Sequence, residues 1–371
     1  MKLFGRKPTT DPVVAPPPPE PELQAATITI GRECTTDAPI RWALLDRSGY
    51  PGSLAIVASA EHRSRLIGAA AAELALAGPL LLVDPLESLD LLQPLTSHRI
   101  GAGRGIDLVG EPKTETTTVA RSNAAIAWWS ASGAEWTPAV ELILEQTIDA
   151  LRRAGETPTI ERLAHLLREA AARAADPQLR GGCARISEGL FSVLAAAPAR
   201  ALLTDPTGPL PSDRDLRISI APEIRDSAEA LRLSAPGILR LVAQLIAQRH
   251  DGSLLIPSLT DLGSRDLVER LVADLFWPLR SNGTGLVIGA DALAPWPNEP
   301  GVPSSIVARA DAWLVEADDH YRHGWEVILG ERGDPVAMSA RFDQVRELGG
   351  DALLIAPSVR AEPIALRAFN V

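Results

Sequence analysis

The chain has 371 residues, of which 46% are hydrophobic and 22% are charged, and its formal net charge is −11. This composition is that of a globular protein with a large core, and the acidic balance excludes a broad basic surface for wrapping nucleic acid. The two cysteines, Cys34 and Cys183, are too few for a disulfide framework or a thiolate metal site. They favour a reduced, cytoplasmic location.

The amino-terminal residues 1–25 are predicted to form a disordered arm. Four consecutive prolines, Pro16 to Pro19, follow a short basic stretch, and no apolar core typical of a signal peptide is present. The arm either docks a partner or is simply solvated. The most apolar stretch, Leu66–Val83, carries Glu73 and is interrupted by Gly78-Pro79, which predicts a helix and a buried strand of a soluble protein.

Residues 26–137 read as the first part of an α/β core. An alternating strand and its hairpin partner come first, and charge-free runs typical of buried parallel strands follow. An Ala-rich helix over Arg65–Ala77 ends at Gly78-Pro79. The expected strands are Thr27–Arg32, Ile40–Leu44, Ser53–Val57 and Leu80–Asp84.

Residues 138–204 are predicted to form an inserted helical subdomain. Apolar residues recur at helical spacing through Pro138–Ala201. Interruptions of the helices are expected near Gly155–Pro158, Asp176-Pro177 and Gly181-Gly182. A Pro/Gly linker is expected over Asp205–Asp213.

The α/β pattern resumes in residues 205–371, which form the second part of the core. The alternation of strands and helices predicts a mostly parallel sheet with helices on both faces. Helices are expected over Ala235–His250 and Asp266–Leu279. The strands are Leu216–Ala221, Ser253–Ile256, Gly285–Gly289, Ala312–Val315, Trp325–Leu329, Leu353–Ala356 and Pro363–Phe369.

The segment between the strand Ser53–Val57 and the following helix is where a phosphate loop would lie. Such a loop reads G-x-x-x-x-G-K-[ST], and its amides and lysine bind phosphates. The chain has only three lysines, Lys2, Lys7 and Lys113, and none follows a glycine. Three interpretations stay open: an ordinary strand-to-helix turn, an altered phosphate loop, or a working ATP site in which an arginine replaces the lysine. The segment consists of Ala58, Ser59, Ala60, Glu61, His62, Arg63, Ser64 and Arg65.

The order of these parts resembles the HerA/FtsK-like branch of P-loop ATPases, which includes DNA-pumping motors and conjugative coupling proteins. The resemblance covers roughly residues 27 to 369 and implies a P-loop NTPase-like sheet with an inserted helical region. It is carried by Ile30-Gly31-Arg32, Gly52-Ser53-Leu54, Leu82-Val83-Asp84-Pro85, Gly252–Leu262 and Leu279–Gly289.

The departures from the family pattern imply that the nucleotide chemistry is lost. Ala58 and Arg63 stand at the two glycine positions, Ser64 stands at the lysine and Arg65 at the hydroxyl. A side chain at a glycine position crowds the approach of phosphates. Pro257-Ser258 replaces the acidic pair that would hold the metal.

The pocket equivalent implied by the resemblance is therefore Ala58 to Arg65 with Asp84, Pro257 and Ser258, with no catalytic residue and no metal site. Arg280 precedes a sensor-like strand, and it is either an arginine acting in trans on a neighbouring subunit or a solvated one.

The resulting hypothesis is a pseudo-ATPase, a structural or regulatory subunit of a DNA-translocation, conjugation or secretion-type assembly. No cofactor is expected. An active ATPase relative or further copies of the chain would be the partners, with nucleic acid reached through the assembly. The alternatives are an active DNA translocase that uses ATP and Mg²⁺ with Arg63 or Arg65 in place of lysine, and an α/β scaffold without nucleotide history.

Overall fold

The computed structural model describes most of the predicted core. Described are a few single residues and the ranges 26–44, 52–91, 95–101, 137–204, 215–226, 252–262, 279–291, 309–319, 335–356 and 363–369. The amino-terminal arm, the linker over Asp205–Asp213 and the strand expected over Trp325–Leu329 lie outside them, as do most residues of the helices expected over Ala235–His250 and Asp266–Leu279.

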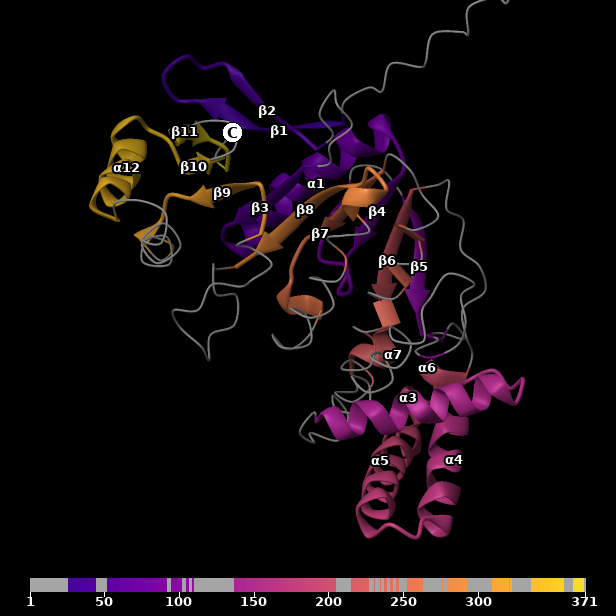
Figure 1. The fold of residues 1–371 in the computed structure, drawn as a ribbon. Coiled ribbons are helices and arrows are strands. Elements are labelled where there is room, and N and C mark those ends of the chain that lie inside the picture. The colour runs from indigo at the N-terminus through magenta and orange to yellow at the C-terminus, as the bar shows by residue number, and fades with distance from the viewer. Residues whose placement is uncertain are drawn as a thin grey trace, which may run out of the picture.

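The described strands form one eleven-stranded sheet in the order β2-β1-β11-β10-β9-β3-β8-β7-β4-β6-β5 (Figure 1). From β9 to β5 all pairs are parallel, and from β2 to β9 they are antiparallel. The predicted mostly parallel α/β sheet is confirmed. The strands are β1 Thr27–Glu33, β2 Pro39–Ala43, β3 Ser53–Val57, β4 Leu80–Val83, β5 Thr96–Ile100, β6 Leu216–Ile220, β7 Ser253–Ile256, β8 Gly285–Ala290, β9 Ala312–Glu316, β10 Ala352–Ile355 and β11 Ile364–Arg367.

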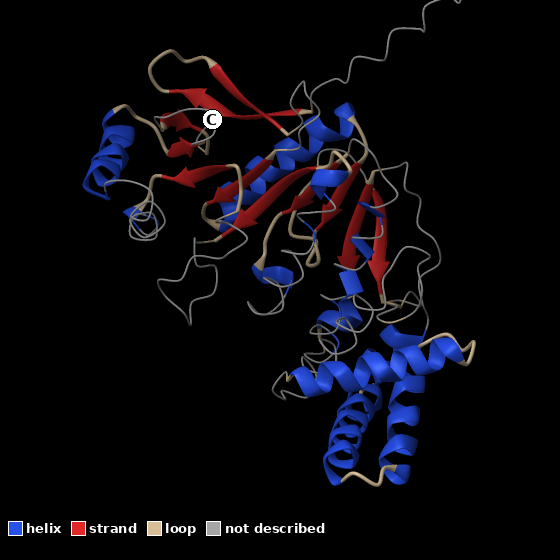
Figure 2. Ribbon diagram, viewed as in Figure 1, coloured by secondary structure: helices blue, strands red, loops and turns tan. Residues whose placement is uncertain are grey.

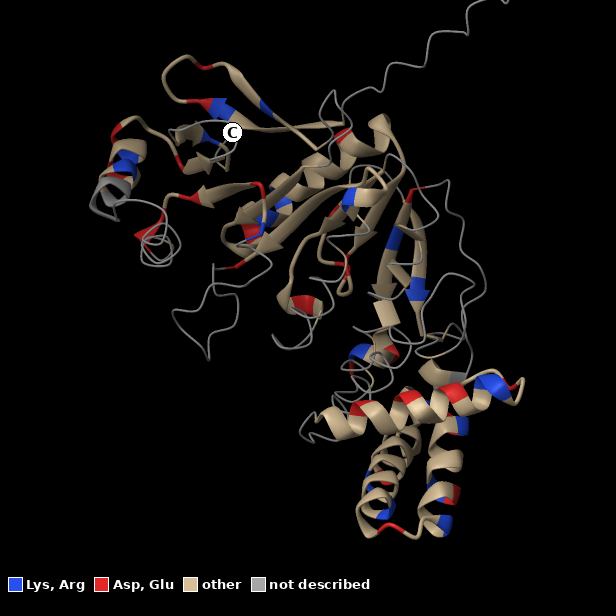
Figure 3. Ribbon diagram, viewed as in Figure 1, with Lys and Arg blue, Asp and Glu red and all other residues tan. Residues whose placement is uncertain are grey.

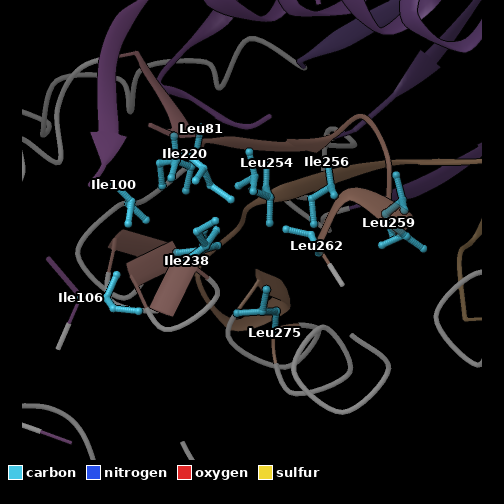
Figure 4. Close-up of a cluster of buried hydrophobic side chains, with 14 of the residues drawn as sticks. Leu81, Ile100, Ile106, Ile220, Ile238, Leu254, Ile256, Leu259, Leu262 and Leu275 are labelled. Atoms are coloured by element: carbon cyan, nitrogen blue, oxygen red, sulfur yellow. The ribbon is translucent and has the colours of Figure 1, made fainter. Parts of the chain in front are cut away.

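Both faces of the sheet are covered, which explains why β3, β4, β7 and β8 carry no charge. Alternate residues of these four strands join two separate apolar clusters, one on each face. Helix α1 (Ala60–Ala77) packs on one face through Leu66, Ile67 and Leu74. Figure 4 shows the opposite cluster, where Leu254 and Ile256 of β7 meet side chains from several segments.

Four helices between β5 and β6 in the chain form the predicted helical region, and they gather beyond the ends of these strands (Figures 1 and 2). The side chains of Thr137, Thr159 and Asp176 each accept a hydrogen bond from a backbone N–H at the start of a helix. The breaks expected near residues 155–158 and 176–177 are confirmed. The helices are α3 Pro138–Arg153, α4 Ile160–Arg173, α5 Pro177–Ala195 and α6 Ala197–Thr204.

The break expected at Gly181-Gly182 is wrong, because both glycines lie inside α5. A Cβ atom on Gly182 would lie 2.8 Å from Cδ1 of Ile143 in α3. Glycine therefore allows close approach of two helices here, and tertiary packing outweighs its low helix propensity.

Two regular elements were not predicted, namely β5 and α12 (Pro335–Glu347). Two short helical turns complete the described structure, α7 (Pro222–Arg225) and η1 (Thr260–Leu262). β5 is an edge strand in which only His98 and Ile100 are buried, so it lacks the apolar run of an inner strand. Within the described residues, no helix has the length and apolarity needed to cross a membrane.

Substitution of Ile56 tests how much a buried side chain of the sheet contributes to stability. It is fully buried in β3, so Ile56→Ala should lower the free energy of unfolding by about 2–5 kcal/mol, since the cavity adds to the lost transfer energy. Leu76→Ala on α1 is the control, because Leu76 is 79% exposed and its truncation should change stability by less than about 0.5 kcal/mol. Urea denaturation measures both. Equal effects would contradict the assigned burial.

Candidate functional site

The ends of the parallel strands β3, β7, β8 and β9 meet at one edge of the sheet, the carboxyl edge, where ligands bind in open α/β sheets. Helix α1 begins there at Ala60, five residues before the expected start, so the predicted loop from Ala58 to Arg65 is wrong for all but its first two residues. The Ser59 side chain makes no capping hydrogen bond. The start of the helix is therefore stabilised by groups from elsewhere in the chain.

The main stabilising group is the carboxylate of Glu316, the last residue of β9. Its Oε2 accepts a hydrogen bond from the backbone N–H of Ser59 at 2.7 Å, and its Oε1 lies 2.7 Å from Nδ1 of His62. The Glu316 side chain is only 14% exposed. An internal anion thus occupies the positive end of α1, where the helix dipole favours negative charge.

The second internal ion is Arg63, which is buried and forms an ion pair with Asp291 just after β8. Its Nη1 also donates to the carbonyl oxygen of Ala58 at 3.3 Å. Its stem crosses Gly289, where a Cβ atom would lie 2.5 Å from Cδ of Arg63 and would collide with the carbonyl oxygen of Pro257. Gly289 is therefore required for the path that Arg63 takes. Figure 3 shows basic and acidic segments side by side near the end of β3.

Polar residues after β7 complete the cluster around Arg63. The hydroxyls of Ser258 and Thr260 lie 2.8 Å apart, and Thr260 donates to Asp291 at 3.5 Å. Burial raises the pKa of Asp261, while a hydrogen bond from Ser258 and the charge of Arg63 act in the opposite direction. Burial likewise raises the pKa of Tyr321 to about 12.

Asp261 in turn sustains the charge on Arg63. Burial lowers the pKa of Arg63, and the charge of Asp261 opposes this. Guanidinium groups stay protonated in proteins, so Arg63 is a permanent internal cation.

The remaining residues of the predicted loop face away from this cluster. Arg65 is exposed, and its guanidinium contacts Glu61 at 3.0 Å and donates to the carbonyl oxygen of Phe369 at 2.9 Å. Ser64 is half-buried on α1. The Phe369 ring stacks on the imidazole of His62, with 5.2 Å between ring centroids.

Asp84 lies at the same edge, where its charge adds to the burial that raises the pKa of Asp261, but its hydrogen bonds and its ion pair are formed elsewhere. Its fully buried carboxylate accepts hydrogen bonds from the backbone N–H groups of Ser88 at 2.9 Å and Leu89 at 3.1 Å, and forms an ion pair with Arg217 of β6. These contacts fix the turn after β4. β7 and β8 separate this strand from β3, so Asp84 is not brought against the first turn of α1.

Arg280 lies before β8, at the opposite, amino edge of the sheet. Its Nη2 is 3.5 Å from Asp311, which precedes β9, and its side chain is 45% exposed. Asp311 also accepts hydrogen bonds from the N–H and the hydroxyl of Ser53, at 2.9 and 2.7 Å. The role of Arg280 in trans stays a prediction.

Sequence reasoning missed three carboxylates of the site, Asp261, Asp291 and Glu316, and the ring of Phe369. Glu316 ends β9, and the other three follow strands of the same sheet, namely β7, β8 and β11. That position relative to a strand end was a usable signal for the aspartates and the glutamate. Nothing local indicated that Phe369 reaches His62.

Comparisons with known proteins place this site within a known fold. No protein-family model matches the sequence, and no curated protein matches it. Solved structures do match. VirB4 of Thermoanaerobacter pseudethanolicus is similar with a TM-score of 0.64 at 13% identity, over 93% of this chain and 96% of that one. The plasmid coupling protein TrwB in complex with the GTP analogue GDPNP has a TM-score of 0.50 at 16% identity, over 94% and 85%.

The chain shares the fold of VirB4. The fold implied by the resemblance is confirmed, whereas the domain boundaries and the roles of the site residues stay predictions. At identities this low, the similarity shows the arrangement of helices and strands but not the chemistry of the pocket.

The raised pKa of Asp261 predicts a pH-dependent stability. Because the folded state binds this proton more tightly than the unfolded state, wild type loses stability as the pH rises above about 4. Asn has no proton to lose, so the stability of Asp261→Asn relative to wild type should increase as the pH rises above about 4, up to the pH at which Asp261 is ionised in the folded state as well.

Urea denaturation across this pH range measures the difference. Asp90→Asn, at an exposed position, controls for the loss of one negative charge. A stability difference that is the same at every pH would contradict the proposed environment of Asp261.

Proposed function

We propose that the chain is a catalytically inactive HerA/FtsK-like subunit, which acts as a structural or regulatory component of a DNA-translocation, conjugation or secretion-type ATPase assembly. The observation that carries the proposal is that the chain's own ions, Glu316 and Arg63, occupy the edge of the sheet where the predicted phosphate loop lies.

The anion side of the pocket argues against a triphosphate. A phosphate at the start of α1 would have to displace Glu316 from the N–H of Ser59 and from His62. Glu316 is only 14% exposed, and like charges repel more strongly where water is partly excluded.

The cation side argues against magnesium. Hard cations bind through carboxylate and hydroxyl oxygens. Here Asp291 is paired with Arg63, and the positive charge of Arg63 also acts on Asp261. The chain's three lysines are remote in sequence from this segment.

The active alternative requires Arg63 or Arg65 to bind phosphate in place of lysine. Arg63 is buried and paired with Asp291, while Arg65 contacts Glu61 and the carbonyl of Phe369. Both would have to exchange existing partners for the ligand. The inactive subunit is therefore the better supported function.

A role beside an active ATPase is proposed from the fold. VirB4 matches nearly the whole chain, and TrwB, which is similar at lower TM-score, is described as a plasmid coupling protein. A chain of this fold with a self-filled pocket retains its outer surfaces for subunit contacts. The partners we propose are an active relative with an intact phosphate loop, or further copies of this chain.

Mg-ATP binding and hydrolysis test the proposal directly. The pure protein should give no binding heat in calorimetry and no hydrolysis above the blank, whereas a real site would stabilise the fold by several kcal/mol at saturation, roughly 4 kcal/mol at 1,000 times Kd. An ATPase with an intact GK[ST] loop is the positive control. Addition of this chain to an active relative with an intact GK[ST] loop should change the ATPase rate of that relative. Hydrolysis at a motor-like rate by the pure chain would refute the proposal, and a monomer without effect on its neighbour would favour the scaffold.

Arg280→Ala tests action in trans. If Arg280 reaches the nucleotide of a neighbouring subunit, its loss should lower the ATPase rate of a reconstituted mixed assembly by more than about tenfold. Arg173→Ala is the control, because Arg173 is 79% exposed and ends α4, in the helical region and not in the sheet. An unchanged rate in the Arg280 variant would remove it from the mechanism.

A further inference from the structure

The segment after β11 closes over the first turn of α1. β11 is antiparallel to β10, which is antiparallel to β9, so β11 runs in the same direction as β3 and β9. Its last residues therefore emerge at the carboxyl edge, where α1 begins. Residues far apart in the sequence, at 59–65, 316 and 368–369, thus lie together.

The segment is itself held in place by Asp351, which directly precedes β10. Its carboxylate accepts hydrogen bonds from the backbone N–H of Ala368 at 2.6 Å and from that of Phe369 at 3.2 Å. Hydrogen bonds to an ionised acceptor are about twice as strong as neutral ones. The position of Phe369 is therefore set by the sheet and not by the segment alone.

From Phe369 a continuous series of contacts leads to the start of the helix. The ring is 1% exposed and stacks on His62 with an interplanar angle of 10°. His62 contacts Glu316, and Glu316 accepts from the N–H of Ser59. Arg65 adds a second connection through the carbonyl oxygen of Phe369.

These contacts replace the local signals that usually fix a helix start. Ser59 makes no side-chain cap, and the carboxylate that accepts its N–H comes from a residue 257 positions away. The first turn of α1 thus depends on tertiary contacts, whereas the middle of α1 packs on the sheet through Leu66, Ile67 and Leu74. Removing the contacts would free the first turn without detaching the helix.

We propose that Ala368 and Phe369 form a clasp that keeps the first turn of α1 closed and that can open without detaching the rest of the helix. The clasp is independent of the proposed function, because its contacts involve only residues of this chain. The lever accessible from outside is Arg65, whose side chain is 54% exposed while it holds the carbonyl of Phe369.

Hydrogen exchange measured by mass spectrometry on the full chain tests the clasp. In Phe369→Ala, the amides from Arg63 to Ile67 should exchange about tenfold faster than in wild type, while those of β3 and β8 change much less. Phe369→Leu keeps apolar volume but lacks the stacking ring, so it tests the clasp even if the alanine variant fails to fold. Asp351→Asn weakens the anchor and should give the same local pattern to a smaller degree.

Phe342→Ala is the matched control. Phe342 is buried on α12 against the opposite face of the sheet, so its truncation should lower stability without a selective effect on α1. Unchanged exchange at the first turn in both Phe369→Leu and Asp351→Asn would overturn the clasp, as would an increase spread evenly over all strands. These readouts involve no nucleotide, so ATP hydrolysis by wild type would refute the proposed function and leave the clasp standing.

Discussion

The carboxylate of Glu316 connects the parts of the molecule that matter for function. It ends β9, accepts the N–H of Ser59 at the start of α1 and holds His62, on which Phe369 stacks. A carboxylate is stable at this point because helix starts present unpaired N–H groups and the positive end of the dipole. The same physics draws phosphate groups to helix starts. In this chain, the carboxylate of Glu316 takes the place at the helix start that a phosphate would be drawn to.

Arg63 completes the internal neutralisation of the edge. A cation beside a phosphate site ordinarily binds the phosphate. Arg63 instead extends across Gly289 and forms an ion pair with Asp291. Its charge also lowers the pKa of Asp261, which burial raises. Loss of Asp291 would leave the buried charge of Arg63 without its ion-pair partner, which is costly, so the pair favours the inward path of Arg63.

The fold and the pocket respond differently to sequence change. Buried strands such as β3 and β8 require only apolar residues of fitting size, and many sequences meet that requirement. A phosphate site requires glycine, lysine and a hydroxyl at fixed positions. A chain can therefore share most of its length with VirB4 in structure at 13% identity. That Ala58 and Arg63 stand at the glycine positions of a phosphate loop stays a prediction.

The sequence by itself determined the inner architecture. Charge-free runs such as Ser53–Val57 and Leu80–Val83, and the apolar spacing of α3 to α5, reflect burial that local composition must satisfy. The polar edge strand β5 and the real start of α1 were not predictable in this way, because few of their residues are buried or locally capped.

Only the tertiary structure decided what fills the site. Arg63, Asp261 and Asp291 meet because parallel strands end at one edge, and Glu316 and Phe369 come from segments more than 250 residues away from the start of α1. The sequence left three interpretations of the segment from Ala58 to Arg65 open. The charges of the chain that occupy this edge are recognised only when the strands are placed side by side.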